Sequence, residues 1–276
     1  MIIDCHTHIF PSRIAQKAAH DLMHLYGSPP VAGVTAAYLS EHMDHCGVDR
    51  SVILPVATTP DQVRSINTWT LSLLSDCDRF IGLGAMHPDF DTVEDVETVG
   101  DELERLKKAG IRGVKLHPEF QFFYPDEERM FRLYEAFIEH DMLVFFHAGG
   151  GGTWLKEIHG TPERFAAVVD SFPKMKVLAA HFGGYDCWAG VEKYLIGRDI
   201  LFDTAYIFKS DDGTKYLPDD EIVRMVEAHG SEKILFGTDY PFRRQDIEIA
   251  NLIGLDLDDS DKERILGENA AQVFGV

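Results

Sequence analysis

The chain has 276 residues, and its 26 Lys and Arg side chains against 46 Asp and Glu give a formal net charge of −20 at pH 7. This charge argues against a surface that binds nucleic acid or an anionic membrane, because both need clustered cations. A hydrophobic content of 45% with 26% charged residues excludes a chain that is mainly disordered.

The N-terminal residues MIIDCHTHIFP lack the basic and apolar segments of a signal peptide, and no apolar run is long enough to span a membrane. The four cysteines, Cys5, Cys46, Cys77 and Cys187, form no CxxC pair, which is typical of a reducing compartment. We therefore expect a cytoplasmic protein without a membrane or nucleic-acid partner. The length, with no linker or repeat, predicts a single domain over residues 1–276.

Short apolar runs, rich in β-branched and aromatic residues, recur along the chain between turn residues. They are continuous rather than alternating in polarity, which is typical of parallel strands covered on both faces. The eight predicted strands are Ile2–Cys5, Ser51–Val56, Phe80–Met86, Gly113–Leu116, Leu143–Phe146, Val177–Ala180, Ile200–Phe202 and Ile234–Phe236.

Helical patterns separate these strands. Val93–Ala109 stops before Gly110, a residue suited to a helix C-terminus, and Thr161–Phe172 opens with Thr-Pro, a frequent helix start. Further helices are predicted at Glu127–His140, Asp219–His229 and Ser260–Phe274. Eight strands alternating with helices predict an α/β fold, the (β/α)8 TIM barrel. A doubly wound open sheet is the structural alternative.

Histidine and aspartate gather at the carboxyl ends of the predicted strands, where a barrel places its chemistry. These ends carry His6, His8, His87, His117, His147, His181, Asp203 and Asp239. Side chains at i and i+2 of a strand share a face, so His6 and His8 should enter the barrel together. Neutral imidazoles and a carboxylate can bind a catalytic metal whose water ionises near neutral pH. Asp239 and His181 are candidates to move that proton.

Five segments carry a resemblance to a known family: DCHTHIFP (4–11), GVKLHPEFQ (113–121), FFHAGG (145–150), AAHFGG (179–184) and FGTDYPF (236–242). As a set they resemble the amidohydrolase superfamily, within it the amidohydrolase-related group that includes aminocarboxymuconate-semialdehyde decarboxylase. GENAAQVFG (267–275) is similar to the closing helix of that group. The resemblance covers essentially the whole chain and implies a barrel with one metal or, in some branches, two.

By position, the resemblance implies that His6, His8, His147 and Asp239 bind the metal. His181 matches a histidine that binds a second metal in binuclear members and acts beside a single metal in others. We expect one divalent ion per chain, zinc by its ligand types, with manganese or iron as alternatives. The resemblance also implies a homodimer.

Lys115 stands two residues before His117, so both side chains should point inward. Some branches of the superfamily carry a carboxylated lysine at the end of strand four that bridges two metals. We favour an uncarboxylated Lys115 that binds a substrate carboxylate, while His117 either touches substrate or serves the structure. His87 is expected to be a hydrogen-bonded loop residue, and Asp203 either to support the ligands or to cap the segment that follows it.

Aromatic side chains crowd the loops after the strands, either as padding or as walls of a flat, apolar cavity. They are Phe10, Phe120, Phe122, Phe123, Tyr124, Trp154, Tyr185, Trp188, Tyr206, Phe208, Tyr240 and Phe242. Four cations on the same loops, Arg13, Lys209, Arg243 and Arg244, either anchor a substrate carboxylate or balance nearby acids.

These observations predict a metal-dependent hydrolase that acts on a small molecule. The first alternative is a non-oxidative decarboxylase of an unsaturated or aromatic carboxylic acid, which needs the same metal and the same histidines. A lactonase or hydratase also fits. A barrel that binds a metal or ligand without catalysis is the alternative from another class, and the intact ligand positions count against it.

Overall fold

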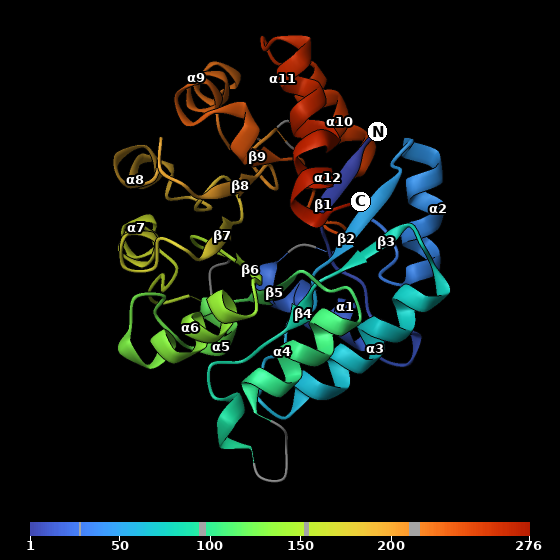
Figure 1. Ribbon diagram of the computed structural model, residues 1–276. Coiled ribbons are helices and arrows are strands. Elements are labelled where there is room, and N and C mark those ends of the chain that lie inside the picture. Colours follow the sequence, from blue (N-terminus) through green and yellow to red (C-terminus); the bar gives the residue numbers. More distant parts are fainter. Residues whose placement is uncertain (28, 94–97, 152–154, 210–215) are drawn as a thin grey trace.

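The computed structural model describes residues 1–27, 29–93, 98–151, 155–209 and 216–276, with parallel strands at the centre and helices outside them (Figure 1). The strands pair in the orders β1-β2-β3 and β4-β5-β6-β7-β8-β9. They are β1 (Ile3–Thr7), β2 (Arg50–Ile53), β3 (Phe80–Gly82), β4 (Gly84–Ala85), β5 (Gly113–Leu116), β6 (Leu143–Phe146), β7 (Lys176–Ala179), β8 (Leu201–Asp203) and β9 (Ile234–Leu235).

Backbone hydrogen bonds join the two runs of strands into one ring. β3 and β4 are pieces of the third predicted strand, interrupted at Leu83, whose N–H donates to the last carbonyl of β2 at 3.1 Å. At the other seam the Cys5 N–H donates to the Phe236 carbonyl (2.8 Å) and the His8 N–H to the Tyr240 carbonyl (2.7 Å). The predicted (β/α)8 barrel is thereby confirmed.

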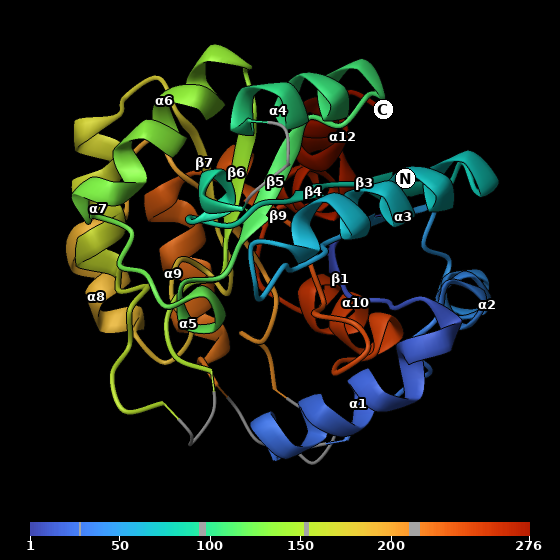
Figure 2. The same cartoon turned by 90° about the horizontal axis from the view of Figure 1, so that it is seen from below.

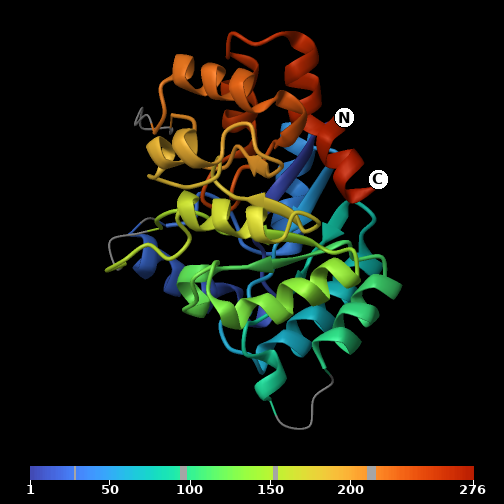
Figure 3. The same cartoon turned by 60° about the vertical axis from the view of Figure 1, so that its left-hand side comes forward.

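Helices flank this ring, except α1, which lies across one end of it (Figures 1 and 2). The helices are α1 (Ser12–Tyr26), α2 (Ala36–Cys46), α3 (Gln62–Asp76), α4 (Val99–Lys108), α5 (Pro118–Gln121), α6 (Phe131–Glu139), α7 (Pro162–Ser171), α8 (Trp188–Tyr194), α9 (Asp219–His229), α10 (Gln245–Ile253), α11 (Asp259–Glu263) and α12 (Asn269–Phe274). The two chain ends lie close together (Figure 3). No helix in the described ranges is both long and apolar enough to cross a membrane.

The helix boundaries follow local capping chemistry. α4 begins at Val99 rather than Val93, because Thr98 and Asp101 form a capping box there, and residues 94–97 lie outside the described part. Gly110 follows α4 with a φ of 89°, a left-handed conformation that suits glycine. The predicted helix at Ser260–Phe274 contains a π-helical turn between α11 and α12.

Strand residues alternate between the interior of the ring and the helix layer. In β6, Leu143 and Phe145 pack inside, whereas Val144 and Phe146 pack against the helices. This alternation is why the strands read as continuous apolar runs, since both faces are covered.

β1 breaks the alternation at its carboxyl end. Cys5 packs inside, and the pairing of β1 with β2 then shifts register between Asp4 and Thr7. The next side chain, His6, still enters the interior, where its ring lies 5.4 Å from that of Phe145. The i and i+2 rule alone therefore does not explain how His6 enters the ring.

Buried Glu102 ties α4 to α3 and, through Asn67, to β4. Its carboxylate accepts hydrogen bonds from Arg64 (2.5 Å), Arg105 (2.6 Å) and Asn67 (2.7 Å). The Asn67 amide in turn bonds both backbone groups of Ala85, at 2.7 and 3.0 Å. Asn67 thus satisfies the backbone of β4 as a neighbouring strand would.

We expect Glu102→Gln to lower the free energy of unfolding by about 2 kcal/mol, because it removes the charge of the buried carboxylate from its hydrogen bonds with Arg64 and Arg105. Urea denaturation measures this change. The control Glu104→Gln removes an exposed carboxylate that pairs with Lys108 in the same helix, and should change stability by less than about 0.5 kcal/mol. Equal losses in the two variants would contradict this role for Glu102.

Candidate metal centre

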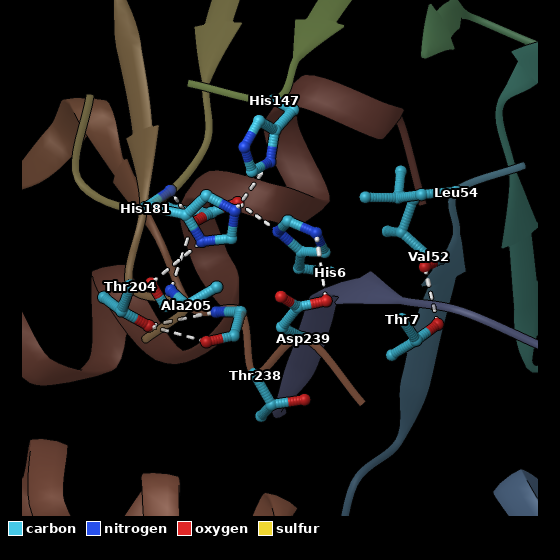
Figure 4. A network of polar contacts seen from close by, with 12 residues as sticks. His6, Thr7, Val52, Leu54, His147, His181, Thr204, Ala205, Thr238 and Asp239 are labelled. Carbon is cyan, nitrogen blue, oxygen red and sulfur yellow. Dashed lines mark hydrogen bonds and ion pairs between the residues drawn. The ribbon is translucent and has the colours of Figure 1, made fainter. Parts of the chain in front are cut away.

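Five side chains from four strand ends meet inside the ring, and Figure 4 shows four of them. His6 and His8 come from the end of β1, and their Nε2 atoms are 3.2 Å apart. Oδ1 of Asp239, which follows β9, lies 3.5 and 3.2 Å from these two atoms. Nε2 of His181, after β7, is 3.1 Å from Nδ1 of His147, after β6. The structure thus brings the five predicted side chains together.

Hydrogen bonds fix the protons of His6 and His8 on the nitrogen that faces away from the centre. Nδ1 of His6 lies 2.7 Å from Oδ2 of Asp203, and Nδ1 of His8 lies 2.9 Å from the Leu54 carbonyl oxygen. Both partners only accept, so each Nδ1 carries the proton. The two Nε2 atoms consequently present lone pairs to each other and to Asp239.

The same reasoning applies to His147 and His181. Nδ1 of His181 donates to the Ala205 carbonyl (3.2 Å), and Nε2 of His147 donates to the Gly150 carbonyl (2.9 Å). The nitrogens that face each other across 3.1 Å therefore both carry lone pairs.

Protonation of His6, His147 and His181, which would relieve the repulsion between the facing lone pairs, is disfavoured near neutral pH. Burial lowers the pKa of His6 and of His147 well below the ordinary value, and burial together with the nearby His6 lowers that of His181 to about 4. Imidazole nitrogens and a carboxylate oxygen are a donor set that a divalent cation fits.

The structure groups His181, rather than His147, with His6 and Asp239. One ligand atom of each of His6, His181 and Asp239 lies within 4.8 Å of the others. His147 stands beside His181 and stacks on His117, with ring centroids 4.0 Å apart. The sequence analysis expected His147 as a metal ligand and His181 beside the metal. In the structure, His181 is the histidine grouped with His6 and Asp239.

Asp203 supports two of these histidines from the end of β8. One oxygen accepts the proton of His6 Nδ1, and the other accepts from the backbone N–H of His181 (2.8 Å) and of Ala205 (3.0 Å). The carboxylate is fully buried, and burial raises its pKa to about 6. The expected supporting role of Asp203 is thus visible in its contacts.

Asp4 fixes β1 against the turn that carries Asp239. Its oxygens accept from the Thr238 hydroxyl (2.6 Å) and N–H (3.0 Å), from Gln245 (2.8 Å) and from the His6 N–H (3.1 Å). Both oxygens of this buried carboxylate therefore accept hydrogen bonds that connect β1 with the turn after β9 and with α10.

Two of the five side chains stand on left-handed backbone. His181 has a φ of 56° and Asp239 a φ of 65°, values uncommon for residues other than glycine. The Trp188 indole N–H donates to the His181 carbonyl (3.1 Å) and helps to hold this turn. Such conformations end the strand alternation and allow both side chains to turn inward.

Lys115 and His117 both line the cavity above the ring, as their spacing predicted. Lys115 is 1% exposed, and its ammonium lies 4.3 Å from the centre of the Phe145 ring. Burial lowers its pKa to about 8, and Nζ has no hydrogen-bond partner among the described residues. His117 is held by the Phe120 N–H, which donates to its Nδ1 at 3.3 Å.

The cavity has a volume of about 780 Å³ and reaches from the five side chains to α1 and α3. Of the aromatic residues expected around it, those that line it are Phe10, Phe120, Tyr185, Tyr206 and Phe242. Phe123, Phe208 and Tyr240 are buried in the core instead. Phe122 is 72% exposed, and Trp154 lies outside the described residues.

The sequence analysis missed further cavity residues on helices. They include Tyr26 of α1 and Trp69 of α3, and Tyr216, which precedes α9, lines the cavity as well. The signal in α1 is an apolar residue every three or four positions, but this pattern is the same whether a helix faces a core or a cavity.

The four candidate cations have different surroundings. Arg243 is buried, bonded to Glu248 at 2.8 Å and packed 5.5 Å from the Tyr206 ring, so it supports the cavity wall. Arg244 pairs with Asp246 on the surface, and Lys209 is exposed. Arg13 lines the cavity and has no ion-pair partner in the described part of the chain.

His87 is buried, and its Nδ1 accepts from the Asp89 N–H at 3.1 Å. This agrees with the prediction of a hydrogen-bonded loop residue.

Comparison with known proteins identifies the family. The Amidohydro_2 (Amidohydrolase) family model matches residues 3–276, and the chain belongs to this family. A 2-amino-3-carboxymuconate-6-semialdehyde decarboxylase of Dictyostelium discoideum is 24% identical over 227 residues, which are 72% of this chain and 62% of that relative. The chain thus spans less than two thirds of that curated relative.

Solved structures share the fold over nearly their full length. A 2,6-dihydroxybenzoate decarboxylase in complex with 2,6-dihydroxybenzoate has a TM-score of 0.73 at 15% identity, with 100% of this chain and 99% of that chain covered. A dihydroxybenzoic acid decarboxylase from Polaromonas sp. JS666, with bound manganese and the inhibitor 2-nitroresorcinol, has a TM-score of 0.70 at 16% identity, with 99% and 96% covered.

We expect Asp203→Asn to weaken metal binding by about 10- to 100-fold, because it removes the carboxylate that orients His6 and His181. Titration against a chelator of known affinity measures the change. The control Asp199→Asn alters an exposed aspartate four residues earlier and should leave the affinity unchanged. Unaltered metal affinity in Asp203→Asn would show that His6 is oriented without it.

Proposed function

We propose that this chain is a metal-dependent decarboxylase that releases carbon dioxide from an aromatic or unsaturated carboxylic acid. The carrying observation is the buried ammonium of Lys115, which has no hydrogen-bond partner in the described ranges, in an aromatic-lined cavity beside a donor set that fits a divalent cation. The sequence analysis placed hydrolysis first and decarboxylation second. The decarboxylase relatives, and a buried Lys115 ammonium suited to bind a carboxylate, favour decarboxylation over hydrolysis.

His6, His8 and Asp239 are proposed to hold the cation, since their lone pairs converge within 3.2 to 3.5 Å. When bound, the cation would polarise oxygen atoms of the substrate and hold them in place. Zinc fits the imidazole donors, while manganese is the ion bound in the Polaromonas relative. A homodimer, implied by the sequence resemblance, stays a prediction.

His147 and His181 are proposed to divide two tasks between them. One completes the binding of the cation, and the other handles a proton beside it. The sequence resemblance gives the binding task to His147, whereas the proximity of His181 to His6 and Asp239 gives it to His181. Their mutual contact of 3.1 Å means that either assignment keeps the other imidazole next to the substrate.

Lys115 is proposed to bind the carboxylate of the substrate. An ammonium that is buried without a hydrogen-bond partner is costly, and a carboxylate would supply a charge-assisted bond in a region of low dielectric. In the absence of a substrate, the ring of Phe145 stabilises the ammonium of Lys115. His117 is stacked between Phe120 and His147, at 4.0 Å from each ring, and is proposed to present the edge of its ring to the substrate.

Asp239 is proposed to move the proton of the reaction. Its side chain is 15% exposed and faces the cavity as an ionised carboxylate. It would take a proton from an acidic hydroxyl of the bound acid and return it to the carbon that loses carbon dioxide. One carbon–carbon bond then breaks and one carbon–hydrogen bond forms, while the negative charge of the carboxylate ends on the deprotonated hydroxyl oxygen, which takes up a proton from water.

Metal content tests the proposed ligands. We expect one tightly bound divalent ion per chain after reconstitution, measured by plasma mass spectrometry. His6→Ala should lose it. Of His147→Ala and His181→Asn, the variant that loses the ion identifies the binding histidine, and the other should retain it while losing turnover. Two tight ions together with a carbamate on Lys115, seen as added mass, would contradict the mononuclear centre.

Turnover tests the reaction itself. Metal-loaded protein incubated with hydroxybenzoates and unsaturated dicarboxylic acids in deuterium oxide should release carbon dioxide and leave one deuterium at the vacated carbon. Asp239→Asn should lower turnover by roughly 10²- to 10⁴-fold, because it removes the group that carries the proton. Incorporation of oxygen from ¹⁸O-labelled water without release of carbon dioxide would instead support hydrolysis.

A further inference from the structure

The apolar side of α1 faces the cavity instead of the core. Ala15 is the buried residue of this 15-residue helix. Its apolar residues at positions 14, 18, 22 and 25 share one face and line the cavity. Ile14 remains 41% exposed. An amphipathic helix normally buries such a face, so this one presents apolar surface that a ligand would cover.

A second part of the cavity lining comes from α3 and the loop after β2. Ile66 and Trp69 of α3 and Leu54 and Val56 of the loop supply apolar surface there, next to the polar Thr58, Gln62 and Ser65. We call the space between α1 and these four apolar residues the apolar arm. It belongs to the same cavity as His6 and Asp239, so a molecule bound at the proposed metal centre can extend into it.

The size of the cavity exceeds what a single substituted ring requires. Its volume of about 780 Å³ falls in the range of roughly 300 to 1,000 Å³ that is typical of sites for drug-sized ligands. The α1 residues that line it lie between Arg13 and Tyr26, and at about 1.5 Å per residue this stretch spans roughly 20 Å along the helix. A ligand confined to the proposed metal centre would leave much of this wall uncovered.

We propose that the substrate carries an apolar substituent, a second ring or an alkyl chain, that lies in the apolar arm between α1 and α3. This inference rests on the proposed decarboxylase function and narrows its substrate class. Covering the α1 face removes apolar surface from water and stabilises the complex. The named solved relatives, by contrast, are decarboxylases of single-ring dihydroxybenzoic acids.

Two inert acids test the arm by calorimetry on the metal-loaded protein. Benzoate and biphenyl-4-carboxylate carry the same carboxylate and differ by one phenyl group. We expect biphenyl-4-carboxylate to bind at least tenfold more tightly, because the extra ring buries apolar surface. Equal affinities, or tighter binding of benzoate, would overturn the proposal.

Adjacent positions on α1 provide a matched pair of variants. Ala18 lines the cavity, whereas Ala19, turned about 100° around the helix, does not. Ala18→Trp should fill the arm, abolish the preference for biphenyl-4-carboxylate and leave benzoate binding unchanged. Ala19→Trp should keep the preference. A preference that survives Ala18→Trp, in protein with wild-type circular dichroism, would place the second ring elsewhere and contradict the arm.

The two proposals fail in distinguishable ways. Neither probe needs to react, so a selective arm in a protein that releases no carbon dioxide would contradict the decarboxylase function alone. Release of carbon dioxide from single-ring acids, with no gain from the second ring, would contradict the arm alone. If neither probe binds metal-loaded protein, the apolar arm is contradicted as well.

Discussion

At the carboxyl ends of the barrel strands, histidine nitrogens face one another with lone pairs and without protons, and the rest of the site depends on this constraint. Hydrogen bonds to Asp203 and to backbone carbonyls commit every outward ring nitrogen to donating. The inward nitrogens then repel each other and the carboxylate of Asp239, and burial disfavours protonation of His6, His147 and His181. The fold thus maintains an arrangement that is unfavourable alone and becomes favourable around a cation.

The scaffold maintains this arrangement through buried polar groups below it. Asp4 joins β1 to the turn after β9, the seam at which the ring closes, and Asp203 joins β8 to both His6 and His181. Asp4 and Asp203 therefore both connect neighbouring strands of the ring and position the side chains of the candidate metal centre. Lys115 differs from them, because its charge is buried without a hydrogen-bond partner among the residues the structure describes, and it faces the cavity.

Much of this was accessible from the sequence because the signals are local. Continuous apolar runs located all eight strands, and polar residues at their carboxyl ends located His6, His8, His147, His181 and Asp239. The details that failed depend on contacts between distant segments. The register shift in β1 arises from its pairing with β2, and the burial of Arg243 arises from Glu248 and Tyr206. The cavity-facing side of α1 was hidden because its periodicity equals that of a core helix.

The position of α1 separates two demands on the chain that usually compete. With Ala15 as its buried residue, this helix adds little to the cohesion of the barrel, while it forms a long wall of the cavity. Mutations on its inner face can therefore accumulate without unfolding the protein. A lineage that carries this barrel can exchange one substrate for another by changing α1, while the chemistry at the strand ends is inherited intact.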